Sequence, residues 1–254
     1  MNDLVTIIIT TYNSSSTIKQ CLFSVLNQTY KNIEILIYDD CSSDLTDKLV
    51  KEALKDTEIN YIVKSGDENF GGPAKGRNWG CANAKGDYIC FLDADDTWDM
   101  NKIMFQLNVM KTKGLTISST NAVIINGEQF PLISGYISVN RMIKRNRLIL
   151  SSIMIKKNII KNLSYVFNED IKYISVEDYD LFLRLSILKN KIFVISERLT
   201  NYLVLEDSIS HIDVKKNELK RLHVLKRLEV NNIFQYLWKW FVIMSYQIKF
   251  ACSI

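Results

Sequence analysis

The chain has 254 residues, of which 47% are hydrophobic and 24% charged, so we expect a packed globular core and not a disordered chain. A net charge of +4 is too small to indicate a nucleic-acid-binding protein, and two prolines and nine glycines exclude a collagen-like or linker-rich chain. Five cysteines, odd in number and without a CxxC pair, are typical of the reducing cytosol and not of a disulfide framework or a zinc site.

The first 114 residues alternate between predicted strands and predicted helices. The strands are apolar runs, and the helices carry apolar residues at helical spacing. We expect strands at residues 5–9, 33–38, 59–63 and 88–92, and helices at 18–26, 45–54, 74–84 and 101–110, with residues 14–16 and 42–44 capping the first two helices. This order predicts an α/β fold with a mostly parallel sheet and helices on both faces.

After Gly114 the pattern becomes less regular. Strands are expected at residues 115–119, 122–125, 153–155, 191–195 and 200–204, and a helix follows residues 176–180. The chain enters its first predicted strand soon after Met1 and has no run of 18 apolar residues, so we expect neither a signal peptide nor a membrane-spanning helix.

Polar side chains follow the predicted strands of the first half at the points where those strands end. They are Thr10, Tyr12 and Asn13, then Asp39 and Asp40, then Asp93, Asp95 and Asp96. Parallel strands bring such ends to one edge of a sheet, where α/β proteins bind ligands. Carboxylates crowded in this way repel one another, and a hard divalent cation offsets the repulsion. The pattern predicts a site for a metal and a diphosphate, while a solvated acidic turn that caps a helix is the alternative.

Five motifs in this order resemble the inverting family 2 glycosyltransferases of the GT-A fold. They are residues 11–13, the turn at 37–44, residues 71–78, the Asp93-Ala94-Asp95-Asp96 run, and Glu177-Asp178. The resemblance covers residues 4 to about 205. It departs from the family at Cys41, where glycine is usual, and a residue other than glycine has less backbone freedom. The resemblance implies a catalytic domain at 1–205, with a nucleotide-binding half at 1–114 and an acceptor-binding half at 115–205, and a helical extension at 206–254.

The resemblance also implies a UDP-sugar as the donor. Asp40 would accept a hydrogen bond from the uracil N3–H, which agrees with the chemistry because a carboxylate accepts from an imide and cytosine has no donor there. Asp39, Thr10, Tyr12 and Asn13 would line the same pocket. Arg77 would face the nucleotide near Asp40, although a surface arginine is the alternative.

Mn²⁺ or Mg²⁺ is the expected metal, because oxygen ligands select these ions over zinc. The resemblance implies that Asp95 is the direct ligand and that Asp93 contacts the ribose or a metal-bound water. Asp96 would reach the sugar hydroxyls. The ion would neutralise the charge that develops on the departing diphosphate.

An inverting transfer needs one base that removes the proton of the acceptor hydroxyl. The resemblance assigns this role to Asp178, with Glu177 orienting the acceptor; the alternative is an acidic helix N-terminus favoured by the helix dipole. His211, in a polar loop after the last predicted strand, would contact the diphosphate, and a surface histidine is the alternative.

The last 40 residues combine positive charge with aromatic side chains. Residues 215–227 hold six Lys and Arg against one Glu, and residues 233–250 are rich in Phe, Trp, Tyr and Ile. A basic helix followed by an amphipathic aromatic helix is typical of a segment on an anionic membrane. We therefore expect a cytoplasmic enzyme at the inner face of the cytoplasmic membrane, acting on a lipid-linked saccharide of O-antigen or capsule synthesis. Packing on the catalytic domain or in a homodimer is the alternative.

Two other functions fit parts of the pattern. A nucleotidyltransferase also uses a sheet and metal-binding carboxylates, but it needs a glycine-rich basic loop, and residues 10–19 offer only Lys19. A non-catalytic, membrane-associated partner with the same fold would bind UDP and transfer nothing. A dinucleotide oxidoreductase is disfavoured because the first strand–helix turn lacks the required glycines.

Overall fold

A computed structural model describes residues 2–161, 163–188, 191–205, 214–230 and 232–251 of the chain. The first half contains β1 (Val5–Thr11), α1 (Ile18–Leu26), β2 (Ile33–Asp39), α2 (Thr46–Leu54), β3 (Asn60–Ser65), α3 (Ala74–Asn83), β4 (Tyr88–Asp93), β5 (Thr97–Trp98) and α4 (Lys102–Thr112). The second half contains β6 (Ile117–Ile125), β7 (Gly135–Ile137), α5 (Val139–Lys144), the 3-10 helix η1 (Leu150–Ser152), β8 (Ile153–Lys156), α6 (Lys157–Ile160), the 3-10 helix η2 (Ile171–Tyr173), α7 (Glu177–Ile187), β9 (Ile192–Leu203), α8 (Val214–Arg227) and α9 (Ile233–Ala251).

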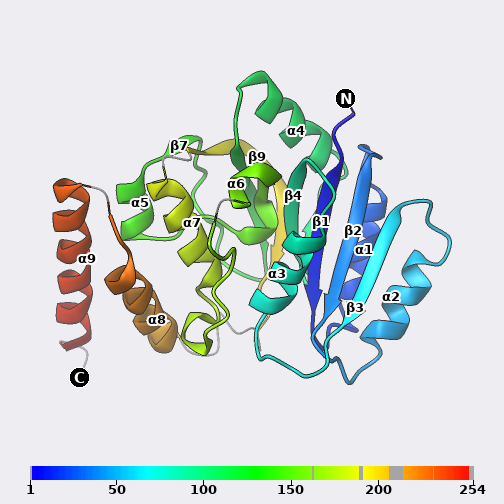
Figure 1. Cartoon of the computed structure of the whole chain (residues 1–254), viewed down its shortest axis with the longest axis horizontal. Helices are drawn as coiled ribbons and strands as arrows, with labels where there is room; N and C mark the ends of the chain where they lie inside the picture. The colour runs from blue at the N-terminus through cyan, green and yellow to red at the C-terminus, as the bar shows by residue number, and fades with distance from the viewer. Residues whose placement is uncertain (1, 162, 189–190, 206–213, 231, 252–254) are drawn as a thin grey trace.

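The strands form one sheet in the order β3-β2-β1-β4-β8-β6-β9-β5, and β7 pairs with β9. β1 to β4 pair in parallel, β8 is antiparallel to β4 and β6, and β9 is parallel to β6. β5 and β7 run antiparallel to β9. Most strands therefore share one direction, which confirms the α/β fold with a mostly parallel sheet (Figure 1).

Alternating side chains of β1 divide the core into two layers. Ile7 and Ile9 pack with α1, α2 and α4 on one face of the sheet. Ile8 packs with α3, α5 and α7 on the other face, and buried residues of α8 and α9 join this second layer. In Figure 1, α9 lies at the end of the molecule farthest from α2. The C-terminal helices thus extend the layer that carries α3 and α7.

Local details differ from the sequence predictions in several places. The two strands expected at 115–119 and 122–125 are one strand, β6, interrupted by register shifts around Asn121. The two expected at 191–195 and 200–204 are likewise one strand, β9. The N-cap of α1 is Thr17, not one of residues 14–16, and its side chain makes no capping bond.

The C-terminal helices bury one of their lysines. Lys239 of α9 is buried, and its Nζ donates to the Leu228 carbonyl at 2.9 Å. Within the described residues, no helix is both long enough and apolar enough to cross a membrane. The four cysteines that the structure describes are free thiols.

Candidate active site

The predicted convergence of polar strand ends is present. Thr10 of β1 lies opposite Tyr38 of β2 on one side and Asp93 of β4 on the other. The backbone N–H of Asp40 donates to the Thr11 carbonyl at 2.9 Å, so the β2 end is tied to the β1 end. The sheet register therefore brings the three polar groups to one edge.

Hydrogen bonds join the loops that leave β1 and β2. Asn13, in a left-handed conformation with φ of 46°, donates its backbone N–H to Ser42 Oγ at 2.8 Å. Its side-chain oxygen accepts from Ser43 N–H at 2.8 Å. Asn13 thus shapes this loop pair, while the neighbouring Tyr12 is exposed and free to cover a ligand.

Asp39 and Asp40 are both buried at the end of β2. Asp39 accepts from the Ser42 hydroxyl at 2.5 Å, and Asp40 accepts from Phe70 N–H at 3.2 Å. Burial raises the pKa of both carboxyls. Since an ionised carboxylate has about four acceptor positions, Asp40 keeps capacity for a further donor such as a base imide.

Cys41 occupies the position at which the family resemblance leads us to expect glycine. Its φ is 63°, in the left-handed region that glycine adopts most easily. The thiol donates to the Gly66 carbonyl at 3.1 Å, which holds the turn against the loop after β3. The turn geometry is therefore one that favours glycine, and the cysteine adopts it with a side-chain hydrogen bond.

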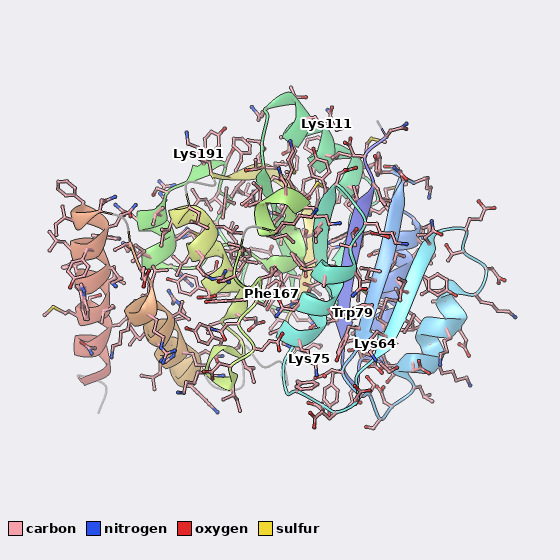
Figure 2. All side chains as sticks on the ribbon, in the orientation of Figure 1. Lys64, Lys75, Trp79, Lys111, Phe167 and Lys191 are labelled. Atoms are coloured by element: carbon pink, nitrogen blue, oxygen red, sulfur yellow. The ribbon has the colours of Figure 1, made fainter. Side chains whose placement is uncertain are left out.

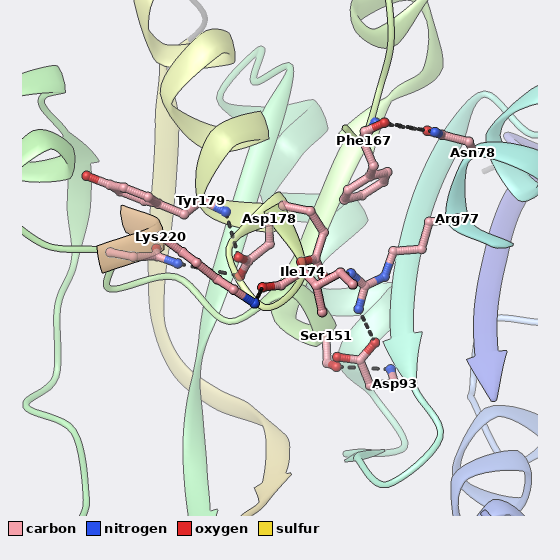
Figure 3. A network of polar contacts seen from close by, with 11 residues as sticks. Arg77, Asn78, Asp93, Ser151, Phe167, Ile174, Asp178, Tyr179 and Lys220 are labelled. Carbon is pink, nitrogen blue, oxygen red and sulfur yellow. Dashed lines mark hydrogen bonds and ion pairs between the residues drawn. The ribbon is translucent and has the colours of Figure 1, made fainter. Parts of the chain in front are cut away.

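Arg77 lies at the centre of the site. It is buried on α3, and one of its nitrogens donates to Asp93 at 2.6 Å (Figure 3). Another nitrogen donates to Glu177, also at 2.6 Å. Burial lowers the pKa of Arg77, but the charges of Asp93 and Glu177 outweigh it and raise that pKa above its usual value. The arginine is not a surface residue, and its ion pairs with Asp93 and Glu177 join the end of β4 to α7 and do not involve Asp40.

The loop at residues 163–170 closes over Arg77. Asn78, the next residue of α3, exchanges hydrogen bonds with the backbone of Phe167 at 2.8 Å in both directions (Figure 3). The Phe167 ring lies 5.5 Å from the guanidinium and packs edge-on against Phe91 of β4. Phe167 and Trp79, which contacts Tyr38, appear on either side of α3 in Figure 2. The Phe167 ring therefore helps to shield the buried arginine from water.

Asp95 is the best candidate ligand for a metal. Burial, and then the charge of Asp93, raise the pKa of Asp95 to about 6, so a cation would be favoured there. Among the described residues, no three His, Cys, Asp or Glu side chains gather to hold an ion alone. Mg²⁺ is usually bound by one or two carboxylates together with waters and substrate phosphates, and Asp93 and Asp95 fit that donor set.

Asp96 does not match its expected role at the sugar hydroxyls. Its side chain is fully buried, with one oxygen accepting from Ser151 Oγ at 2.5 Å and the other from Leu203 N–H at 3.0 Å. Burial and the charges of Asp95 and Asp93 raise its pKa well above the usual value. In this arrangement Asp96 joins the turn after β4 to the end of β9 and presents no oxygen to a ligand.

Glu177 and Asp178 open α7 on the other side of Arg77. Glu177 is buried, and its second oxygen, Oε2, has no hydrogen-bond partner among the residues that the structure describes. Asp178 is half-buried; it accepts from Tyr179 N–H at 2.6 Å and from the Asn146 amide at 3.5 Å. Burial, and then the charge of Glu177, raise the pKa of Asp178 to about 7. A carboxyl with this pKa can exchange a proton near neutral pH.

Two supporting residues were missed by the sequence analysis. Ser151 donates to Asp96 and accepts from Asp93 N–H at 3.2 Å, and Asn146 contacts Asp178. Neither has a local sequence signal, because each acts across a long chain separation. Asn78, the last residue of the 71–78 motif, holds the 163–170 loop. His211, a predicted diphosphate contact, lies outside the described residues.

The sequence is similar to known transferases. A family model described as Glycosyl transferase family 2 matches residues 6–165. The chain is 36% identical over 189 residues to the UDP-Glc:alpha-D-GlcNAc-diphosphoundecaprenol beta-1,3-glucosyltransferase WfaP of Escherichia coli, covering 72% of this chain and 70% of that protein.

Two solved structures share the fold. One is TarS 1-349 of S. aureus in complex with UDP-GlcNAc, with a TM-score of 0.74, 22% identity, and coverage of 92% of this chain and 69% of that one. The other is the mannosyltransferase PcManGT of Pyrobaculum calidifontis in complex with GDP-Man and Mn2+, with a TM-score of 0.71, 14% identity, and coverage of 90% and 65%. At sequence identities of 22% and 14%, the similarity to these structures shows a shared fold alone.

Proposed function

Because the chain belongs to glycosyl transferase family 2 and has the GT-A fold, we propose that it moves a hexose or N-acetylhexosamine from a UDP-sugar to a lipid-linked saccharide with inversion. The acceptor saccharide is carried by a polyprenyl diphosphate, in the synthesis of a bacterial surface polysaccharide such as O-antigen or capsule. The activity that WfaP's name gives, with UDP-glucose and a diphosphoundecaprenol acceptor, supports this choice.

The observation that carries the proposal is the position of Arg77 between Asp93 and Glu177. One buried cation joins Asp93, at the end of β4, to Glu177, the first residue of α7. In this proposal the donor diphosphate binds on the Asp93 side of Arg77, and the base lies on the Glu177 side. Two substrates bound on the two sides would meet over Arg77, and holding reactants in such a geometry is a large part of catalysis.

Asp178 is the proposed base. Its pKa of about 7 lets it be ionised at neutral pH and still accept the proton of an acceptor hydroxyl. Asn146 and Tyr179 N–H hold the carboxylate in place. The unpartnered Glu177 Oε2 is buried beside it, and an acceptor hydroxyl would satisfy that oxygen, which otherwise costs about 1–3 kcal/mol.

Asp95, with Asp93, is the proposed site for Mn²⁺ or Mg²⁺. When bound, the ion would supply Lewis-acid stabilisation of the diphosphate leaving group. Asp93 is held by Arg77 and by the packing of η1, so its orientation is fixed before the donor binds. The Mn2+ complex of PcManGT supports the choice of metal.

The uridine is proposed to lie at the ends of β1 and β2. Asp40 would accept from the uracil imide, and Thr10, Asn13 and Asp39 would form the wall of the pocket, with Tyr12 exposed at its rim. Because Phe70 N–H donates to Asp40, uridine binding at Asp40 would also affect the loop after β3, which carries Phe70.

A membrane-facing role for α9 fits a lipid-linked acceptor. The helix packs on the protein through Val242 and Ile243 and exposes a stripe with Phe234, Leu237 and Phe241. α8 beside it is rich in Lys and Arg. Such a combination is typical of a helix lying on an anionic membrane surface. We therefore propose that the reaction takes place at the inner face of the cytoplasmic membrane. The alternative is that the exposed stripe of α9 forms the interface of a homodimer.

A donor panel tests the proposed function. The protein is incubated with radiolabelled UDP-sugars, UDP-glucose first, and a GlcNAc diphosphate carrying a long alkyl chain, with Mn²⁺ or with EDTA. Transfer that requires the ion and disappears in Asp178→Asn, while UDP binding persists, is the expected result. UDP binding without transfer to any acceptor would instead support a non-catalytic partner, and release of pyrophosphate from UTP a nucleotidyltransferase.

A further inference from the structure

A cavity of about 120 Å³ lies near the proposed base. Asn146, which lines it, contacts Asp178 at 3.5 Å. Arg145 and Arg147 flank Asn146 in the chain and also line the cavity. Asn146 therefore connects the cavity to the proposed base.

The guanidinium groups of Arg145 and Arg147 are available to bind an anion. Both side chains are exposed, and within the described part of the chain neither guanidinium has a hydrogen-bond or ion-pair partner. Residues 129–168 hold seven Lys and Arg and no Asp or Glu. A pair of unpaired guanidinium groups is suited to phosphate oxygens, which they bind through short, charge-assisted hydrogen bonds.

Much of the remaining cavity wall is apolar, and hydrogen bonds hold part of it in place. Phe130, Pro131 and Ile149 contribute apolar lining. Asn121, at the bulge of β6, fixes this wall because its amide donates to the Ile133 carbonyl at 2.8 Å and its oxygen accepts from Ile133 N–H at 3.1 Å. The cavity is thus preformed, with an apolar wall on one side and two cations at its rim.

We infer that Arg145 and Arg147 bind the diphosphate of the acceptor, with the first part of its lipid chain against the apolar wall. This inference rests on the proposed function and assigns the acceptor's phosphate subsite. In an acceptor such as GlcNAc diphosphate, the attacking hydroxyl and the anomeric diphosphate are on different carbon atoms of the sugar, so separate groups of the protein can hold them. With the diphosphate at the arginines, the hydroxyl would reach Asp178 past Asn146. The site would then select acceptors by their charge as well as by their sugar.

Direct binding tests the assignment without requiring activity. The probe is GlcNAc α-diphosphate esterified to an undecyl chain, and the matched neutral probe is undecyl N-acetylglucosaminide. In the full chain, R145Q/R147Q is expected to raise the Kd of the diphosphate probe at least tenfold and to leave the Kd values of UDP and of the neutral probe unchanged. The R145K/R147K variant should recover most of the affinity. Arg141→Gln removes an exposed cation of α5 that does not line the cavity, and should change nothing.

Other outcomes overturn the inference. An unchanged Kd for the diphosphate probe in R145Q/R147Q would do so, and so would an equal loss for both probes. Binding to anionic phospholipid vesicles separates a second source of phosphate: if R145Q/R147Q loses vesicle binding but keeps the diphosphate probe, the arginines bind membrane headgroups instead. If the wild type binds the probe through the arginines but transfers no sugar, the proposed function fails and the subsite stands. If the wild type transfers sugar and R145Q/R147Q binds normally, only the subsite fails.

Discussion

Arg77 and Glu177 form a buried ion pair at 2.6 Å across 100 residues of chain. The same guanidinium holds Asp93 at 2.6 Å. Because these contacts lie in a site shielded by Phe167, one buried side chain links the end of β4 to the start of α7. The two halves of the catalytic region are therefore coupled through Arg77.

Replacing Arg77 with alanine should destabilise the protein strongly. Glu177 would remain buried without its cation, and breaking a buried pair in this way costs about 3–5 kcal/mol. The free energy of unfolding in urea measures the loss. Lys51→Ala is the control, since it breaks an exposed pair with Asp47 and should cost less than about 1 kcal/mol. A loss in Arg77→Ala as small as that of the control would contradict the coupling.

Transfer should depend on the ionisation of Asp178. Its pKa is about 7, so kcat/KM for the acceptor, at saturating UDP-sugar and Mn²⁺, should fall below pH 7 by about one log unit per pH unit. A carboxylate with the ordinary pKa of 3.8 would give a flat profile from pH 5 to 8. Observation of that flat profile would remove Asp178 as the base.

The raised pKa of Asp178 also predicts how the free energy of unfolding changes with pH. The pKa of Asp178 is higher in the folded state than 3.8, so its neutral form favours the fold. This contribution is fully present below about pH 3.8 and is lost as the pH rises through about 7. Asp178→Asn should therefore raise the melting temperature at pH 8. A lower melting temperature at that pH would argue against the raised pKa.

Cys41→Gly should stabilise the turn after β2. A residue other than glycine at φ of 63° carries a strain of about 1–2 kcal/mol, which exceeds the weak thiol hydrogen bond to Gly66. We expect a gain of up to about 1 kcal/mol in the free energy of unfolding. Cys41→Ala keeps the strain and loses the hydrogen bond, so it should be less stable than the wild type. The reverse order of the two variants would refute this explanation.

Lys102 is a buried cation that destabilises the fold at neutral pH. It is fully buried, donates to Gln106 at 2.8 Å, and burial lowers its pKa from 10.5 to about 8. The charged form is thus disfavoured in the folded state by about 3 kcal/mol, and stability should rise as the pH increases from about 8 to 10.5.

Lys102→Met should increase the free energy of unfolding at pH 7 by about 1–2 kcal/mol, less than the full effect because Gln106 loses its donor. Thermal and urea unfolding measure the gain. Lys113→Met, an exposed change at the end of the same helix, should stay within about 0.5 kcal/mol. A loss of stability in Lys102→Met would mean that the ammonium group is better solvated than its burial implies.

The order of strands and helices and the site edge could be predicted from sequence. Each apolar run led to polar residues, and parallel pairing alone places Thr10 beside Asp93. The positive φ of Cys41 fits the expectation, taken from the family resemblance, that glycine is usual at this position.

Contacts that depend on long-range packing could not be predicted. The partners of Arg77 lie on β4 and α7, and no local pattern connects them. Asp96 shares its acidic run with Asp95, yet the packing of Ser151 and Leu203 buries it. Lys239 resembles a polar interruption in an apolar helix, but the carbonyl at Leu228 gives it a buried partner. Hydrophobic periodicity predicts which face of a helix or strand is apolar. It does not predict which polar side chain forms a buried hydrogen bond or ion pair.

The configuration of the product tests the account most directly. The protein, UDP-glucose with its α-linked sugar, Mn²⁺ and the alkyl GlcNAc diphosphate are incubated, and the new glycosidic bond is analysed by the proton coupling at its anomeric centre. A single displacement assisted by Asp178 predicts a β bond, and no product from Asp178→Asn. An α bond in the product, or undiminished transfer by Asp178→Asn, would contradict the account.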